Sequence, residues 1–284
     1  MPKKNDSILL EVPDLLLRSK LILKGYLSGI HSVPYKGASA EFSQYREYVL
    51  GDDYDRIDWK AYMRSGRYYV KESDNESNTG MSFLLDASAS MAFAGKFEYA
   101  KTLAFLFSYI CAKQNDSFSY AVFSDKLHIY RKAGTGRKAI YDAGRDISLR
   151  TPGGETNLAP ILEKIFEKIK ESSFLILISD LGDNEEKLIE LMARMRVKKH
   201  DSIIFHLSSR LEESREILDK ESLRDIETGS LSQGGGYRER IDAIKERNKK
   251  INDLSLERGI DYNHVYVEDG FNAPLSKFFS RRNQ

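Results

Sequence analysis

The apolar positions of this chain follow a helical period at its start and an alternating strand-and-helix pattern beyond residue 80. Residues 12–28 carry apolar side chains at helical spacing, which predicts an amphipathic first helix. Residues 29–80 are rich in Gly, Tyr, Arg and Asp without a clean period. They predict loops and short strands, ending in a strand near residues 67–72. We therefore expect an N-terminal segment over 1–79 and a second domain over 80–284.

The second domain alternates apolar runs of strand length with helical patterns. Strands are expected at 81–86, 174–179, 202–207 and 262–267, with a hairpin over 117–124 and 126–131. Helices are expected at 96–113, 137–149, 158–170, 185–197, 237–258 and 274–281, with an irregular insertion near 208–236. Such alternation predicts an α/β fold: a doubly wound, mainly parallel sheet with helices on both faces and the N-terminal segment packed on it.

Composition and charge narrow the class of protein. The chain has 284 residues, 41% of them hydrophobic and 31% charged, which is typical of a globular protein. The net charge of +1 gives no overall field to favour nucleic acid or a membrane surface. A single cysteine excludes a disulfide framework, and the start lacks the apolar core of a signal peptide. No apolar run approaches the roughly 20 residues of a membrane span, so we expect a cytoplasmic protein.

Candidate chemistry lies where the predicted strands end. Asp86 closes the first strand of the domain, and Ser88 and Ser90 follow it in the next loop. Thr156 lies in a Gly-rich loop before a helix, and Asp180 follows a second apolar strand. Because ligands of open α/β sheets bind at the carboxyl ends of the strands, we expect these five residues to converge.

Two carboxylates and three hydroxyls form a set of ligands suited to Mg²⁺, with Mn²⁺ or Ca²⁺ as alternatives. Two aspartates offset the charge of the ion, and hydroxyls add oxygen without further charge. A free coordination position could then accept an Asp or Glu from a protein partner. Asp-x-Ser-x-Ser alone is also common in loops and helix caps. The prediction therefore depends on the joint order along the chain: an acid after a strand, a hydroxyl before a helix, and a second acid after a strand.

The same residues resemble a known metal site. The stretches 86–91, 153–157 and 178–180 are similar to the metal-ion-dependent adhesion site of von Willebrand factor A domains. The resemblance implies that Ser88, Ser90 and Thr156 are direct or near-direct ligands, and that Asp86 and Asp180 act directly or through water. The family often has Gly after the last acid, but Leu181 follows here. Asp183 is therefore the alternative second acid, and the strand-end position favours Asp180.

A charged, aromatic stretch before the sheet narrows the resemblance. Residues 41–48, 51–53, 56–60 and Arg64 resemble the signature of the bacterial domain-of-unknown-function family 58. Residues 223–229 and 258–262 resemble the C-terminal part of that family. The resemblance extends over roughly residues 20–280. It implies a cytoplasmic bacterial protein that works with a MoxR-type AAA+ ATPase in a chaperone-like or assembly role. The charged run from Tyr45 to Arg64 is interpreted as an ion-pair network, with a partner-recognition surface as the alternative.

Three functions are compatible with the pattern. We expect a non-enzymatic, metal-dependent protein-binding module. A metal-dependent hydrolase, such as a phosphatase, would use the same ion as a Lewis acid but lacks an evident general base in the sequence. The third possibility is a scaffold that no longer needs the metal.

Overall fold

The structure is a computed structural model that describes residues 4–29, 42–47, 67, 69–73, 80–154, 158–169, 173–182, 185–198, 200–214 and 237–282. Its α-helices are α1 (Lys4–Gly29), α3 (Lys96–Lys113), α4 (Gly136–Ser148), α5 (Ala159–Phe166), α6 (Glu185–Val197), α8 (Tyr237–Glu257) and α9 (Asn272–Arg282). Its strands are β1 (Phe42–Glu47), β2 (Tyr69–Ser73), β3 (Gly80–Asp86), β4 (Phe118–Phe123), β5 (Leu127–Gly134), β6 (Ser173–Ser179), β7 (Ser202–Ser208) and β8 (Asp261–Tyr266). Two short 3₁₀ helices are η2 (Ala89–Gly95) and η3 (Val267–Asp269).

Contacts divide the chain into two compact units. Residues 1–30 and 79–284 form one unit, and residues 31–78 form the other. In the smaller unit, β1 and β2 pair antiparallel. In the larger unit, α1 packs against α3 and α4. The smaller unit ends at residue 78, next to the domain boundary expected between residues 79 and 80. The division into domains stays a prediction.

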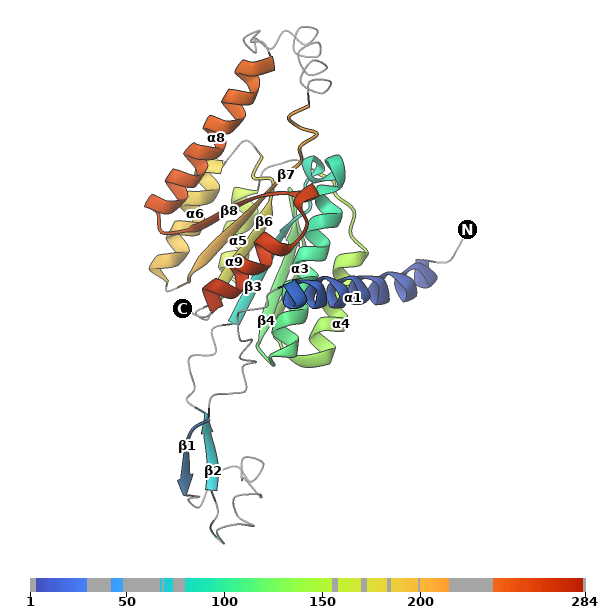
Figure 1. Ribbon diagram of the computed structural model, residues 1–284, viewed down its shortest axis with the longest axis vertical. Helices are drawn as coiled ribbons and strands as arrows, with labels where there is room; N and C mark the ends of the chain where they lie inside the picture. Colours follow the sequence, from blue (N-terminus) through green and yellow to red (C-terminus); the bar gives the residue numbers. More distant parts are fainter. Residues whose placement is uncertain are drawn as a thin grey trace. The chain divides into compact units, whose positions relative to one another are not determined.

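Among the described residues, the larger unit holds a six-stranded sheet in the order β5-β4-β3-β6-β7-β8 (Figure 1). All neighbouring strands are parallel except β4 and β5, which form the expected hairpin. The chain builds outward from β3 through β4 to β5, then returns to β6 and builds outward in the other direction. The strand order therefore reverses between β3 and β6, which is where open α/β sheets place their ligands.

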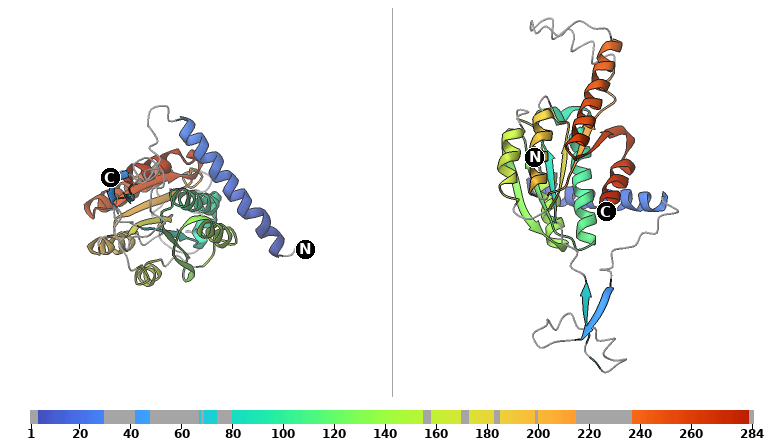
Figure 2. Two further views of the ribbon diagram at one scale, coloured as in Figure 1. Left: turned by 90° about the horizontal axis from the view of Figure 1, so that it is seen from below. Right: turned by 90° about the vertical axis from the view of Figure 1, so that its left-hand side faces the viewer.

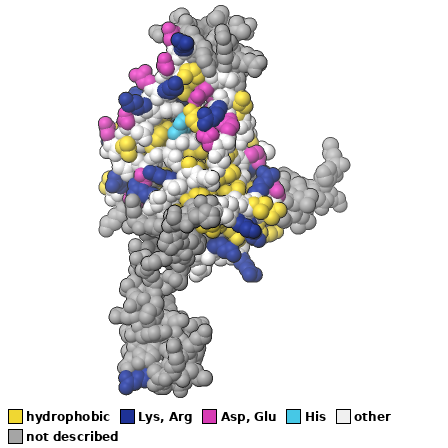
Figure 3. All heavy atoms as spheres, in the orientation of Figure 1, with side chains coloured by type: hydrophobic (Ala, Val, Ile, Leu, Met, Phe, Trp, Pro, Cys, Tyr) yellow, Lys and Arg dark blue, Asp and Glu magenta, His cyan; other side chains and the backbone are white. Residues whose placement is uncertain are grey.

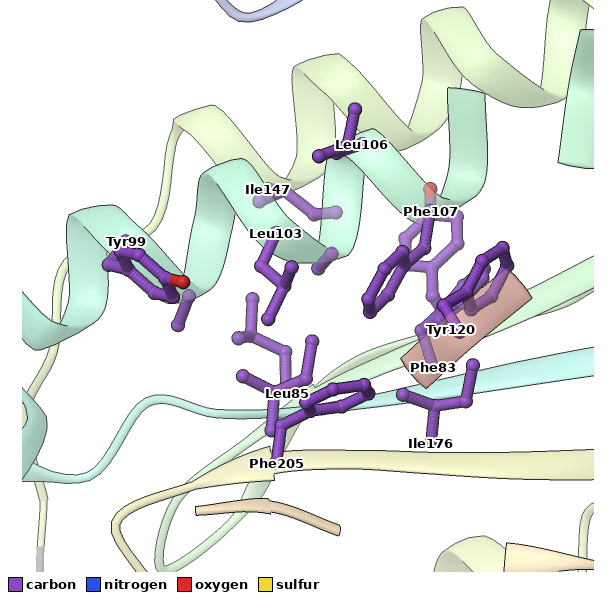
Figure 4. Close-up of a cluster of buried hydrophobic side chains, with 14 of the residues drawn as sticks. Phe83, Leu85, Tyr99, Leu103, Leu106, Phe107, Tyr120, Ile147, Ile176 and Phe205 are labelled. Carbon is purple, nitrogen blue, oxygen red and sulfur yellow. The ribbon is translucent and has the colours of Figure 1, made fainter. Parts of the chain in front are cut away.

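Apolar side chains alternate along the strands and pack against helices on both faces of the sheet. Phe83 and Leu85 of β3 point to the face covered by α3, together with α4 and α9 (Figure 4). Leu84 points to the opposite face, where α5, α6 and α8 pack. The right-hand view of Figure 2 shows the sheet between these two layers of helices. The doubly wound α/β fold predicted from the sequence is confirmed.

The central strand β6 explains why the sequence pattern was informative. Its run Leu-Ile-Leu-Ile, residues 175–178, is buried on both faces, as a parallel strand covered by two helix layers must be. The edge strand β5 is only half-buried to exposed.

The observed elements differ from the expected ones mainly at their ends. The first helix begins at Lys4 instead of residue 12 and runs through Pro13, so its N-terminus does not coincide with the proline that helix starts favour. The helix expected over 158–170 ends at Phe166. Most of the expected insertion, residues 215–236, lies outside the described residues, as does most of the signature between Tyr45 and Arg64.

Candidate functional site

Two aspartates lie at the point where the strand order reverses. Asp86 is the last residue of β3, and Asp180 directly follows β6, the parallel neighbour of β3. Both residues are buried, with relative exposures of 0% and 8%. The parallel pairing places both carboxylates at the carboxyl edge of the sheet, as the sequence predicted.

Asp86 is held by hydrogen bonds to both of its carboxylate oxygens. The backbone N–H of Ser88 donates to Oδ1 at 2.8 Å, and the hydroxyl of Ser179 donates to Oδ2 at 2.6 Å. Burial, reinforced by the negative charge of Asp180, raises the pKa of Asp86 to about 7 despite these hydrogen bonds. The carboxylate is thus fixed in position, and a nearby positive charge would favour its ionised form.

Hydroxyl groups connect the two aspartates. Ser88 Oγ and Ser90 Oγ lie 3.1 Å apart, and the Ser90 hydroxyl donates to Asp180 Oδ1 at 3.0 Å. Four of the five predicted ligands therefore lie in one hydrogen-bonded network. Their short side chains come from two loops and place carboxylate and hydroxyl oxygens, both hard metal ligands, at one point.

The third loop of the predicted site reaches the same edge through its backbone. The N–H of Gly153 donates to the carbonyl of Ala87 at 2.8 Å, and the N–H of Ala89 donates to the carbonyl of Gly154 at 3.2 Å. These two bonds fasten the Gly153–Gly154 turn to the loop that follows Asp86. Thr156 lies outside the described residues, so its role as a ligand stays a prediction. The alternative acid Asp183 also lies outside them.

A lysine and a glutamate complete the site, and the sequence interpretation missed both. The ammonium of Lys96, at the start of α3, lies 2.7 Å from Asp180 Oδ2 and 2.6 Å from Glu212 Oε1. Burial lowers the pKa of Lys96, but Asp180 and Glu212 outweigh it and raise the pKa above its usual value. One signal was present in the sequence: a lysine in the first turn of a helix faces the positive end of the helix dipole, so it needs a compensating acid. Glu212 gave no such signal.

The donor set fits a hard divalent cation. Carboxylate and hydroxyl oxygens are the ligands of Mg²⁺, Mn²⁺ and Ca²⁺, whereas a zinc site would draw on His and Cys. Among the described residues, no group of three or more His, Cys, Asp or Glu side chains could hold a metal ion. The fit therefore depends on the serine hydroxyls beside Asp86 and Asp180.

The other polar clusters near this edge have structural roles in their present arrangement. Ser124 Oγ lies 2.9 Å from His128 Nε2, but Asp125 accepts from the serine hydroxyl at 2.7 Å. Ser124 is fully buried, so this serine is not presented as a nucleophile. His206 is also buried, and its Nδ1 lies 2.6 Å from the hydroxyl of Tyr262.

The described surface in Figure 3 mixes Lys and Arg with Asp and Glu side chains over the visible face. An exposed ion pair, Lys250–Glu186, joins α8 to α6. Among the described helices, none is long and apolar enough to cross a membrane.

Comparisons with known proteins identify a family and distant structural likenesses. The model of the family described as "Protein of unknown function DUF58" matches residues 44–249. A search of curated proteins found no match.

Three solved structures share a loose similarity with this chain. The conserved hypothetical protein BatB from Bacteroides thetaiotaomicron is 14% identical, with a TM-score of 0.47 over 72% of this chain and 98% of that one. The proximal thread matrix protein 1 from the mussel byssus is 17% identical, with a TM-score of 0.36 over 46% of this chain and 36% of that one. An aerotolerance-related membrane protein from Bacteroides fragilis NCTC 9343 is 16% identical, with a TM-score of 0.35 over 46% of this chain and 67% of that one.

Proposed function

The chain belongs to the DUF58 family, and we propose that it is a non-enzymatic protein-binding module that depends on a divalent metal ion. The observation that carries the proposal is the network Asp86–Ser88–Ser90–Asp180 at the reversal of strand order. By the resemblance of these residues to a metal-ion-dependent adhesion site, we infer a von Willebrand factor A-like domain. Metal binding would explain why two carboxylates are buried at this edge of the sheet, which packing alone does not explain.

Ser88, Ser90 and Thr156 would hold the ion, with Asp86 and Asp180 acting directly or through water. Mg²⁺ is the ion we expect, with Mn²⁺ and Ca²⁺ as alternatives. The ion would supply a positive charge that attracts a carboxylate from another protein. Burial of Asp86 raises its pKa to about 7, so an adjacent cation also removes the cost of ionising it.

The partner of this module is an acidic side chain, Asp or Glu, on another protein. By resemblance, we place the module in the cytoplasm beside a MoxR-type AAA+ ATPase, in a chaperone-like or assembly role. Neither nucleic acid nor a membrane span enters the proposal, since the net charge is +1 and the described helices include none that could span a bilayer.

Partner capture in the presence and absence of a chelator tests this function. Asp180→Asn removes one negative charge from the site, and we expect the tagged variant to lose the proteins that wild type retains with Mg²⁺ and releases with EDTA. Asp201→Asn is the matched control, since Asp201 is exposed and precedes β7 at the opposite edge of the sheet. Its captured proteins should equal those of wild type. Equal capture by wild type and Asp180→Asn would contradict the proposal.

A metal-free scaffold is the second candidate, and the position of Lys96 favours it. The ammonium of Lys96 already lies 2.7 Å from Asp180, where it offsets the charge of that carboxylate without a metal. A scaffold of this kind would keep all of its partners in EDTA. The capture experiment therefore separates the two candidates. A hydrolase has weaker support, because Ser124, His128 and His206 are engaged in the structural contacts described above.

A further inference from the structure

Lys96 is buried between two carboxylates that lie far apart in the sequence. Its side chain is 5% exposed, and its ammonium touches Asp180 of the candidate metal site on one side and Glu212 on the other. Lys96 is also the first residue of α3, where the helix dipole disfavours a cation. The lysine is therefore held in this position by the two acids, and it occupies one oxygen of a predicted metal ligand.

Glu212 is fixed independently of Lys96. Its Oε2 accepts the backbone N–H of Ser209 at 2.9 Å, while Oε1 accepts from Lys96 at 2.6 Å. The hydroxyl of Ser209 donates in turn to Glu268 Oε1 at 2.5 Å. The turn after β7 is thus tied to the segment after β8, and it presents a carboxylate that stays in place whether or not Lys96 contacts Asp180.

We propose that Lys96 is a built-in competitor of the metal ion for Asp180, with Glu212 as the group that keeps the ammonium when the ion binds. This inference rests on the proposed metal site. A divalent cation beside Asp180 repels the ammonium of Lys96 at close range. Because Lys96 also contacts Glu212, its ammonium can move away from Asp180 and keep one acidic partner. The affinity of the chain for free metal is thereby held low, and the state of the site is coupled to the turn that carries Glu212.

A purely structural role for Lys96 predicts a different result. If the lysine only fastens α3 to the loops after β6 and β7, replacing it lowers stability and leaves metal affinity unchanged or reduced. If it competes with the ion, replacing it with a neutral side chain raises metal affinity. The two roles thus predict opposite changes in metal affinity when Lys96 is replaced by a neutral side chain.

Titration of the full chain with Mn²⁺, followed by the paramagnetic resonance signal of the free ion, tests the inference. We expect Lys96→Met to bind Mn²⁺ at least about tenfold more tightly than wild type, as expected for removing a competing charge in direct contact. Lys96→Arg retains the charge, so we expect no gain in Mn²⁺ affinity over wild type. Lys101→Met is the matched control on the same helix, because Lys101 pairs with Glu98 away from the site. Its affinity should equal that of wild type.

Glu212→Gln provides a second test that does not depend on the folding of Lys96→Met. Without Glu212, the ammonium has Asp180 as its remaining acidic contact, so we expect weaker Mn²⁺ binding than in wild type. Wild type that binds Mn²⁺ while Lys96→Met binds equally or more weakly overturns the competitor role and leaves the metal site standing. If Lys96→Met does not fold, unchanged or tighter binding by Glu212→Gln overturns that role. Absence of Mn²⁺ binding in both wild type and Lys96→Met overturns the metal site and this inference together.

Discussion

Asp86 is a carboxylate buried at the end of a strand, and its environment disfavours its charge. The N–H of Ser88 and the hydroxyl of Ser179 satisfy its oxygens, but burial and the neighbouring Asp180 still raise its pKa from 3.8 to about 7. The folded protein therefore binds this proton more tightly than the unfolded chain does. In the absence of metal, the contribution of Asp86 to stability falls as the pH rises from about 4 to about 7 and then levels off.

Asp86→Asn removes this dependence on pH. In EDTA, we expect the free energy of unfolding of Asp86→Asn, relative to wild type, to increase by about 2–3 kcal/mol between about pH 5 and about pH 8. Urea unfolding at the two pH values measures the difference. Asp201→Asn, at an exposed position, should show no such increase. A constant difference between Asp86→Asn and wild type would mean that Asp86 is ionised throughout this range.

The residues of the site were predictable to the extent that they follow strand ends. Asp86, Ser88, Ser90 and Asp180 were predicted from their places after two apolar runs, and the structure brings them together. Glu212 was not predictable, because its contact with Lys96 joins residues 116 positions apart and depends on the conformation of a turn. Such a turn has no periodic pattern that a sequence could reveal.

At the scale of elements, the turn at Gly154 fastens one loop of the site to another. Gly154 has a φ of +90°, in the left-handed region that favours glycine. A Cβ at this position would lie 2.3 Å from Asp125 Oδ1 and 2.7 Å from Ser124 Oγ. The turn can therefore approach the β4–β5 hairpin only because residue 154 has no side chain.

Gly154→Ala should disturb both stability and metal binding. We expect the free energy of unfolding to fall by about 1–3 kcal/mol, because of the strained φ and the forced displacement of Asp125. Mn²⁺ binding should also weaken, because the hydrogen bonds of the turn to Ala87 and Ala89 shift. Gly136→Ala is the matched control, since Gly136 has a φ of +68° but open space around its Cβ position. Gly136→Ala should lower the free energy of unfolding by about 1 kcal/mol and leave the Mn²⁺ affinity unchanged. Equal Mn²⁺ affinities in the two variants would show that the turn does not support the site.

At the scale of the whole molecule, strand order determines where the site lies. The alternation of apolar runs and helical patterns predicted the parallel sheet, because a parallel strand covered on both faces must be apolar throughout. The antiparallel edge strand β5 was predicted from the short connection after β4, over Ser124–Lys126. The start of α1 at Lys4 was not predicted, because the apolar helical period used to place this helix begins only at residue 12.

The central claim is that the carboxyl edge between β3 and β6 holds a divalent cation, and direct binding of Mn²⁺ tests it. Calorimetric titration at about pH 8 should show one Mn²⁺ per chain in wild type and none in Asp86→Asn, because the variant loses a charge at the predicted site. The fold of the variant is checked by its unfolding transition under the same conditions. Equal Mn²⁺ affinity and stoichiometry in wild type and Asp86→Asn would contradict the claim.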